Sequence, residues 1–278
     1  MKLKKRSRIY LFLTGMLLLF FWMFWGNRTI QVSQVEITDA EVPDAFIDFK
    51  IAHLSDIHDK NWGETLIAPI QEENPDIIVI TGDLIDSNEP DIYQASLLIE
   101  ELNKIAPIYF VTGNHEAWSG HYDTLKESLL NQSVNILDNE AIVLQRNGEE
   151  LLLLGLKDSA FATEDEHSLT IEARVQELSG QFDGFKLLLA HRPELFESYV
   201  RNDLNLVLSG HAHGGQFRLP FIGGLIAPDQ GLFPEYTSGV YEKNKTKMVV
   251  SRGLGNSIIP LRFNNRPELI FIELTNEL

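Results

Sequence analysis

The 278-residue chain contains 40 acidic residues against 23 basic ones and has a formal net charge of −17. A surface with this excess of negative charge repels polyanions, so no nucleic-acid partner is expected and nuclease activity is disfavoured. The chain has no cysteine, which excludes disulfides and thiolate metal ligands.

The N-terminal segment predicts a membrane anchor. Residues 2–8, "KLKKRSR", carry five basic side chains, and residues 9–25 carry no charge. Seventeen apolar residues span about 25 Å as a helix, close to the thickness of a bilayer core. A cleavable signal peptide is the alternative, but no A-x-A pattern precedes the polar residues. We therefore expect an uncleaved transmembrane helix at residues 9–26, with Trp22 and Trp25 at the outer interface.

The basic cluster before the helix also predicts the orientation. The positive-inside rule places residues 1–8 in the cytoplasm and residues 27–278 outside, in a cell membrane that the chain crosses once. No linker rich in Pro, Gly or Ser interrupts residues 30–278, so these predict one extracytoplasmic domain. The stretch "KRSR" lacks a twin-arginine pair and favours export through the Sec route.

Short apolar runs and helical stretches alternate after the anchor. Helices are expected near residues 64–73 and 91–105, and strands at 29–38, 49–58, 76–83 and 107–116. This alternation is typical of an α/β fold whose first strands are parallel. Residues 141–156 predict a hairpin that turns at Asn147-Gly148, and further strands are expected at 185–191, 204–211, 246–253 and 268–274. The pattern as a whole predicts mixed sheets covered by helices.

Five of these apolar strands end at side chains that bind metals. The residues are Asp56 and His58, Asp83 and Asp86, Asn114 and His115, His191, and finally His211 and His213. In open α/β sheets, ligands collect at the carboxyl ends of the strands. His211 and His213 are two residues apart, so in an extended segment their imidazoles would point to the same side.

The number of candidate ligands predicts two metal ions. Besides His115, the strand ends offer the carboxylates of Asp56 and Asp83, one amide oxygen and four imidazoles. This set is too large for one ion and suits two ions that share a carboxylate. Two divalent ions carry four positive charges, of which Asp56 and Asp83 neutralise two, so the remaining charge favours a phosphate. Nitrogen and oxygen ligands allow manganese, iron or zinc.

The motifs together resemble the complete signature of the calcineurin-like metallophosphoesterases. They are, in order, Asp56-x-His58, Gly82-Asp83-x-x-Asp86, Gly113-Asn114-His115-Glu116, His191 and Gly210-His211-x-His213. Residues 213–228 and 251–268 also resemble the membrane-anchored bacterial branch of the YkuE/YaeI type. The resemblance implies a four-layer αββα sandwich with a dinuclear centre.

The same resemblance implies a role for each motif residue. One ion would be held by Asp56, His58, Asp83 and His213, and the other by Asp83 as a bridge with Asn114, His191 and His211. A hydroxide between the ions would attack phosphorus. His115 would not be a ligand but would protonate the leaving oxygen or contact the phosphate, with its imidazole oriented by Asp86.

One departure from the family concerns phosphate recognition. Some members follow the second motif with an arginine that binds phosphate, whereas this chain has Ser87 there. Arg192, Arg218 and Arg252 are weak candidates for that task.

The function predicted is a dinuclear, metal-dependent phosphohydrolase, more readily a phosphodiesterase than a monoesterase, acting on a membrane or cell-envelope phosphoester. One alternative is a pyrophosphate hydrolase of the UDP-2,3-diacylglucosamine type, which the outward topology disfavours. Another is a non-catalytic module that binds metals. His115 with Asp86 argues against that module, because a pure binder has no use for a non-ligand acid.

Other residues leave two readings open. His53 is either a core histidine or a residue that supports the metal ligands. His121 either borders the substrate or lies in an ordinary surface loop, and Trp118 either borders the substrate or is packed in the protein. His167 is expected in a solvated acidic loop. The apolar segment 219–228 either covers the sheet or forms an apolar wall that turns towards the bilayer.

Overall fold

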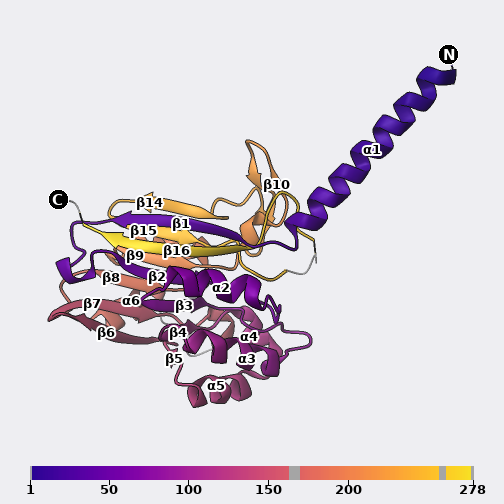
Figure 1. Cartoon of the computed structure of the whole chain (residues 1–278). Coiled ribbons are helices and arrows are strands. Elements are labelled where there is room, and N and C mark those ends of the chain that lie inside the picture. The colour runs from indigo at the N-terminus through magenta and orange to yellow at the C-terminus, as the bar shows by residue number, and fades with distance from the viewer. Residues whose placement is uncertain (1, 163–169, 257–260, 277–278) are drawn as a thin grey trace.

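Two six-stranded β-sheets form the centre of the molecule in the computed structural model, which describes residues 2–162, 170–256 and 261–276 (Figure 1). The first sheet has the order β1 (Gln31–Thr38), β16 (Glu268–Thr275), β2 (Phe49–Leu54), β3 (Ile77–Thr81), β4 (Ile108–Val111) and β5 (Asn135–Ile136). The second has the order β14 (Gly239–Lys243), β15 (Thr246–Val250), β9 (Leu206–Ser209), β8 (Lys186–Leu189), β7 (Glu149–Gly155) and β6 (Glu140–Arg146).

Both sheets are mixed and have a parallel centre. β2, β3, β4 and β5 run parallel, and β16 joins them antiparallel to β2. In the second sheet β15, β9, β8 and β7 run parallel, with β14 and β6 antiparallel at the two edges. The central strands are almost wholly buried, as their near-continuous apolar sequences require.

Helices cover the outer faces of both sheets. The described helices of the domain are α2 (Glu64–Glu73), α3 (Ile92–Asn103), α4 (Asn114–Ser119), α5 (Tyr122–Asn131), α6 (Ile171–Ser179) and α7 (Phe196–Val200), and its short 3-10 turns are η1 (Asp44–Phe46), η2 (Ser159–Phe161), η4 (Pro193–Leu195) and η5 (His213–Gly215). α2, α3 and α5 pack their apolar side chains on the first sheet, and α6 and α7 pack on the second.

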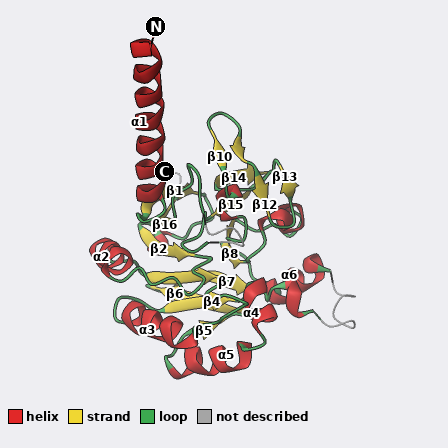
Figure 2. Cartoon of the chain, turned by 90° about the vertical axis from the view of Figure 1, so that its right-hand side faces the viewer, coloured by secondary structure: helices red, strands yellow, loops and turns green. Residues whose placement is uncertain are grey.

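The strands divide their side chains between two cores. Ile51 and Val79 enter the core between the sheets, while their neighbours Ala52 and Ile80 enter the core under the helices. This alternation follows the two-residue period of a strand. The layers are therefore helix, sheet, sheet and helix, which confirms the predicted αββα sandwich (Figure 2).

The predicted hairpin is β6–β7, and its turn residues Asn147 and Gly148 both have positive φ, 51° and 88°, as a type I′ turn requires. The strand expected at 107–116 is shorter than predicted. β4 ends at Val111, and α4 begins at Asn114, because Glu116 folds back to accept a hydrogen bond from the Gly113 N–H at 2.7 Å.

The N-terminal helix α1 (Lys2–Gly26) projects away from the sandwich (Figure 1). Its segment Ser7–Gly26 is 20 residues long and, by length and composition, is the one described helix suited to cross a membrane. None of that segment is buried inside the protein. An apolar helix that projects from the domain with its side chains unburied needs another apolar environment.

Candidate metal centre

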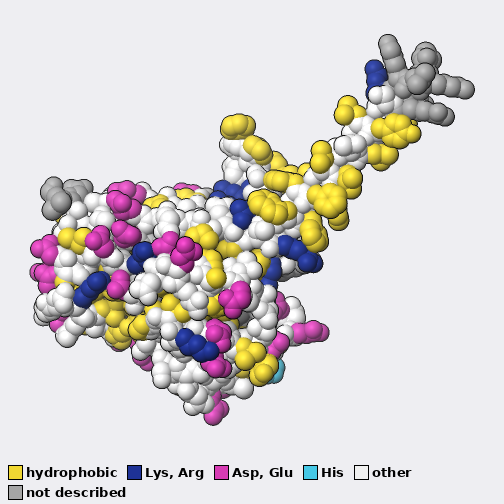
Figure 3. Space-filling view, in the orientation of Figure 1, with side chains coloured by type: hydrophobic (Ala, Val, Ile, Leu, Met, Phe, Trp, Pro, Cys, Tyr) yellow, Lys and Arg dark blue, Asp and Glu magenta, His cyan; other side chains and the backbone are white. Residues whose placement is uncertain are grey.

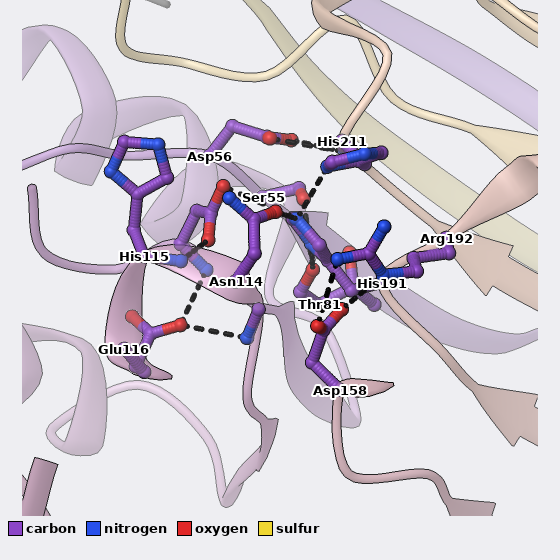
Figure 4. A network of polar contacts seen from close by, with 12 residues as sticks. Ser55, Asp56, Thr81, Asn114, His115, Glu116, Asp158, His191, Arg192 and His211 are labelled. Atoms are coloured by element: carbon purple, nitrogen blue, oxygen red, sulfur yellow. Dashed lines mark hydrogen bonds and ion pairs between the residues drawn. The ribbon is translucent and has the colours of Figure 1, made fainter. Parts of the chain in front are cut away.

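The candidate ligands lie where the carboxyl ends of the two sheets meet. The loops after β2, β3 and β4 of the first sheet bring Asp56, His58, Asp83 and Asn114, and those after β8 and β9 of the second bring His191, His211 and His213. The exposed fraction of each of these seven residues is 9% or less. The structure thus collects all seven predicted ligands in one buried region, and Figure 4 labels four of them, Asp56, Asn114, His191 and His211.

One group of ligand atoms comes from Asp56, His58, Asp83 and His213, and these atoms lie within 4.8 Å of one another. His213 Nε2 is 3.3 Å from Asp56 Oδ1, and His58 Nε2 is 3.7 Å from Asp83 Oδ2. Both ring nitrogens of His58 are buried without a hydrogen-bond partner in the described part of the chain. A buried polar nitrogen left unbonded is costly, so this position suits a ligand to a cation.

A second group comes from Asp83, His191 and His211. His191 Nε2 lies 3.2 Å from Asp83 Oδ2, 3.1 Å from His211 Nδ1 and 3.1 Å from Asn114 Oδ1. Two imidazole nitrogens and two oxygens therefore converge (Figure 4). Asp83 belongs to both groups, so the donor set fits two cations that share one carboxylate.

The pKa values of Asp83 and His191 also indicate a cation site. Burial alone would raise the pKa of Asp83, but His191 and His58 hold it well below its usual range. Burial alone would lower the pKa of His191, and Asp83 outweighs this and raises it to about 10. The carboxylate is thus stabilised by positive charge beside it, which a metal ion would supply in place of the protons.

The backbone at the ligands is unusual. Asp56, His58, Asp83, His211 and His213 all have φ between 46° and 62°, the left-handed region that residues other than glycine seldom occupy. Such conformations cost about 1–3 kcal/mol each and gather at functional sites. The extended geometry expected for His211 and His213 is wrong, because β9 already ends at Ser209. The two imidazoles instead serve different groups.

Close backbone packing explains one glycine of the motifs. A Cβ on Gly210 would lie 1.8 Å from Ser55 Oγ and 2.4 Å from Asp56 Oδ2. Only glycine therefore allows the loop after β9 to approach the loop after β2, and this approach brings the ligands of the two sheets together.

Glu116 is a buried residue to which the sequence alone assigned no role. Its carboxylate accepts hydrogen bonds from the backbone N–H groups of Asp83, Leu84, Ile85 and Gly113, at 2.7–3.3 Å. It therefore ties the loop after β3 to the loop after β4 (Figure 4). Burial and the nearby Asp83 raise the pKa of Glu116 to about 7.

His115 lies beside the two groups and is partly exposed. Its Nδ1 accepts a hydrogen bond from the Ser87 N–H at 3.0 Å, which leaves Nε2 to carry a proton. Asp86, which is predicted to orient this ring, has its Oδ2 3.9 Å from His115 Nδ1 and 3.6 Å from His58 Nδ1, and its orienting role stays a prediction. The backbone N–H of Ser87 makes the hydrogen bond to the imidazole. Asp86, His58 and His115 also form a third group of converging ligand atoms.

Asp229 is a second residue that sequence reasoning missed. Its Oδ2 lies 3.0 Å from Nε2 of His211, whose Nδ1 points into the centre. Asp229 lies in a turn that carries no motif, between residues 226–227 and 231–232, so only the fold reveals the contact. A carboxylate behind a ligating histidine fixes its ring and raises its basicity.

The three arginines considered for phosphate recognition are engaged elsewhere. Arg192 donates two hydrogen bonds to Asp158, at 2.8 and 3.0 Å, and a further one to Asp229 (Figure 4). Arg218 donates to Gly214 O and Thr237 Oγ1. Arg252 lies 3.6 Å from Glu268.

The remaining histidines and Trp118 take distinct positions. His53 is fully buried, with Nε2 2.8 Å from Thr81 Oγ1, and burial lowers its pKa to about 3, as suits a neutral core histidine. His121 is exposed in a surface loop. Trp118 is 61% exposed, and its ring lies 5.6 Å from that of His115. His167 lies outside the described residues.

The apolar segment 219–228 does not simply cover a sheet. It lies in two small hairpins, β10 (Arg218–Leu219) with β11 (Gly223–Gly224), and β12 (Ile226–Ala227) with β13 (Gly231–Leu232). At the tip of the first hairpin, Phe221 and Ile222 are fully and largely exposed. In both views the β10 hairpin rises from the end of the domain that carries α1 (Figures 1 and 2).

A family model described as calcineurin-like phosphoesterase matches residues 49–215, which include every candidate ligand. Among curated proteins, the chain is 33% identical over 256 residues to the uncharacterized metallophosphoesterase YkuE of Bacillus subtilis, covering 88% of this chain and 85% of that one.

Two further relatives carry names that bear on function and location. The phosphodiesterase YaeI of Escherichia coli is 29% identical, with 81% of this chain and 82% of that protein covered. A zebrafish (Danio rerio) transmembrane protein with a metallophosphoesterase domain is 28% identical over 88% of this chain, and the match covers 57% of that longer protein.

Proposed function

Because the chain belongs to the calcineurin-like phosphoesterase family and is a metal-dependent phosphoester hydrolase, we propose that it is a membrane-anchored phosphodiesterase acting on a membrane or cell-envelope phosphoester. The observation that carries the proposal is the pair of buried ligand groups that share Asp83. A shared carboxylate between two cation sites is the arrangement used for in-line displacement at phosphorus.

We assign the ligands as follows. Asp56, His58, Asp83 and His213 would hold one divalent ion, and Asp83, Asn114, His191 and His211 the other. When bound, two such ions supply Lewis acidity towards the phosphoryl oxygens and a nucleophile at neutral pH. Manganese, iron and zinc all suit the donors, and the family normally uses divalent metals.

His115 is the proposed general acid. The Ser87 N–H occupies its Nδ1, so the neutral ring carries its proton on Nε2, the atom free to donate to a leaving oxygen. Asp83 also accepts a hydrogen bond from the His115 N–H at 2.8 Å, which fixes the start of α4 against the centre. Exposed Trp118 beside this ring gives the leaving group of the substrate an aromatic surface.

A diester at the membrane is the favoured substrate class. The relative YaeI is named a phosphodiesterase, and Ser87 supplies no cation for the second negative charge of a monoester. Residues 9–26 would form the anchor, residues 1–8 would be cytoplasmic, and residues 27–278 would be the extracytoplasmic domain. The apolar helix α1, the exposed hairpin tip and the zebrafish relative named a transmembrane protein support this placement.

Two alternatives remain as outcomes to be tested. A pyrophosphate hydrolase acting on a nucleotide-linked lipid would need its substrate on the cytoplasmic face. In a non-catalytic metal-binding module, His115, whose ring carries a proton beside the candidate ligands, would have no function.

The test compares two substrates with the full chain in a neutral detergent, loaded with Mn²⁺. We expect faster hydrolysis of bis-p-nitrophenyl phosphate than of p-nitrophenyl phosphate, and no turnover by Asp83→Ala, which removes the shared ligand. Faster hydrolysis of the monoester would contradict the diester assignment. Stoichiometric metal without turnover on any phosphoester, pyrophosphates included, would favour the binding module.

A further inference from the structure

A cavity lies at the foot of α1, and none of the candidate metal ligands lines it. Its volume is about 140 Å³, and its lining includes Trp22, Trp25, Gln31, Arg252, Arg262 and Arg266. Two tryptophans from the helix and three arginines from the domain thus face one space. No motif or proposed catalytic role explains this combination.

The cavity is held in a fixed place relative to the helix. Asn27, directly after α1, donates from Nδ2 to Arg262 O and accepts from Arg262 N–H through Oδ1, both at 2.8 Å. The Trp22 ring packs edge-on to Phe263, with centroids 5.5 Å apart. The helix end and the segment 261–266 therefore form one joint, and the cavity is part of that joint.

Basic side chains gather around this joint, although the chain as a whole is acidic (Figure 3). Besides Arg252, Arg262 and Arg266, they include Arg28, which stacks on Phe24, and Lys60, which reaches the carbonyl of Asn27. Among the described residues, only Arg252 of these five has a carboxylate oxygen within 4.0 Å, that of Glu268. The other four have no carboxylate oxygen within that distance among the described residues, and Asp56 and Glu268 act on Arg262 from further away.

The most buried of these cations is Arg262, which is 1% exposed. Its guanidinium donates to the carbonyl oxygens of Gly255 and Arg252. These partners are neutral, so an anion in the cavity would stabilise the buried positive charge.

The position of the cavity identifies the anion. With Ser7–Gly26 across the bilayer, Trp22 and Trp25 lie at the interface, and the cavity beside them lies at the depth of the lipid headgroups. Guanidinium groups bind phosphate through paired hydrogen bonds, and indole rings suit the glycerol and upper acyl region. A phospholipid headgroup offers both a phosphate and an apolar continuation.

We propose that this cavity binds the phosphate of an anionic phospholipid headgroup. The lipid is a bound partner there and not the hydrolysed substrate, because none of the candidate metal ligands lines the cavity. The inference rests on the membrane anchoring contained in the proposed function.

Arg262 lies between the cavity and the metal centre, with Nη2 3.4 Å from Nδ1 of His213. Changing Arg262 would disturb both, so the test uses residues further out. Arg28 is exposed, and Arg266 binds only Thr29 Oγ1, Ile30 O and the face of Trp25 among the described contacts. Arg28→Gln alone serves as the milder variant should the double change with Arg266→Gln disturb folding.

The experiment is native mass spectrometry of the full chain in a neutral detergent with equimolar phosphatidylglycerol and phosphatidylcholine. We expect the wild type to retain phosphatidylglycerol preferentially. Its affinity should fall about 5-fold in Arg28→Gln and about 25-fold in Arg28→Gln/Arg266→Gln, because each basic residue near an anionic lipid contributes similarly. Arg201→Gln, at an exposed arginine paired with Glu172, is the matched control and should bind as the wild type does.

Three results would overturn the headgroup site: equal retention of both lipids, unchanged retention in the double variant, or displacement of phosphatidylglycerol by inorganic phosphate at equal concentration. The last would mean that the cavity takes free phosphate. Alkaline carbonate extraction of membranes tests anchoring separately, and hydrolysis of bis-p-nitrophenyl phosphate in the same samples tests the phosphodiesterase. Selective retention without hydrolysis would reject the phosphodiesterase and leave the lipid site standing.

Discussion

His115 carries the proton-transfer step of the proposed mechanism, and its replacement separates acid catalysis from metal binding. For His115→Ala we expect a loss of about 10²–10⁴ in rate on alkyl phosphodiesters, whose leaving oxygen needs a proton. The loss should be much smaller on bis-p-nitrophenyl phosphate, because p-nitrophenolate leaves without one. Steady-state kinetics on both substrates, with metal content measured alongside, provides the test.

His121→Ala is the control for that variant, because His121 is exposed in the loop after α4. Equal losses on good and poor leaving groups would reject the acid role. Loss of a metal ion from His115→Ala would instead indicate that His115 is a ligand. Metal content is measured for this reason, because His115 belongs to the third group together with His58 and Asp86.

Asp229 is expected to tune metal affinity from behind His211. Asp229→Asn keeps the size of the side chain but removes the charged oxygen 3.0 Å from His211 Nε2, so the ring loses the carboxylate that fixes it. Loss of such an outer carboxylate typically lowers metal affinity about 10–100-fold. Calorimetric titration with Mn²⁺ measures this directly. Asp203→Asn, at an exposed carboxylate paired with Lys245, should leave the affinity unchanged, and equal affinities in both variants would contradict the role.

At the residue scale the sequence predicted the candidate ligands better than the residues that support them. Each candidate ligand comes shortly after an apolar strand, so its neighbourhood follows from local pattern and sheet geometry. The supports come from distant or unpatterned positions: Asp229 is 18 residues from His211, and Arg262 is 49 residues from His213. The positive φ of Asp56 and Asp83 was equally hidden, because tertiary contacts rather than residue type impose it.

Among the elements, the β10–β11 hairpin makes a prediction about membrane depth. The chain has no cysteine, so Phe221→Cys can be labelled at one site with a polarity-sensitive dye. On transfer of the full chain from detergent to vesicles, we expect a blue shift of the emission, since the exposed tip shares the α1 end of the domain (Figure 2).

Leu130→Cys is the matched control, because Leu130 is 54% exposed on α5, at the opposite end of the molecule from α1 (Figure 1). Its dye should report the same aqueous surroundings in both samples. An unchanged spectrum at position 221 would show that the hairpin stays in water and would reject its contact with the bilayer.

The regular helices and strands could be predicted because the repeated spacing of their apolar residues is visible in the local sequence. The central strands and the helices α2 and α3 match the expected ranges within a few residues. The short elements did not, since α4 depends on the hydrogen bonds of Glu116, and η5 begins at His213 after the strand has ended. Where a segment is shaped by side-chain contacts across the fold, periodicity carries no information about it.

For the whole molecule, the charge balance of the centre predicts how metal binding depends on pH. His191 has a pKa raised to about 10, so between pH 6 and 9 it holds a proton that a metal must displace. Mn²⁺ affinity should therefore rise with pH through this window, with release of about one proton per His191 neutralised. Calorimetry in two buffers of different ionisation enthalpy counts the protons; a binding enthalpy independent of buffer would contradict the expectation.

The joint at Asn27 has a consequence for kinetics. The end of α1 is hydrogen-bonded to the segment that carries Arg262. In the membrane-anchored arrangement proposed above, this joint would hold the candidate metal centre at a set height above the lipid plane. A lipid-borne substrate of the proposed class would then reach the centre by lateral diffusion in two dimensions. Velocity should follow the mole fraction of substrate in the surface, and dilution with inert lipid should slow the enzyme even when the bulk substrate concentration is constant.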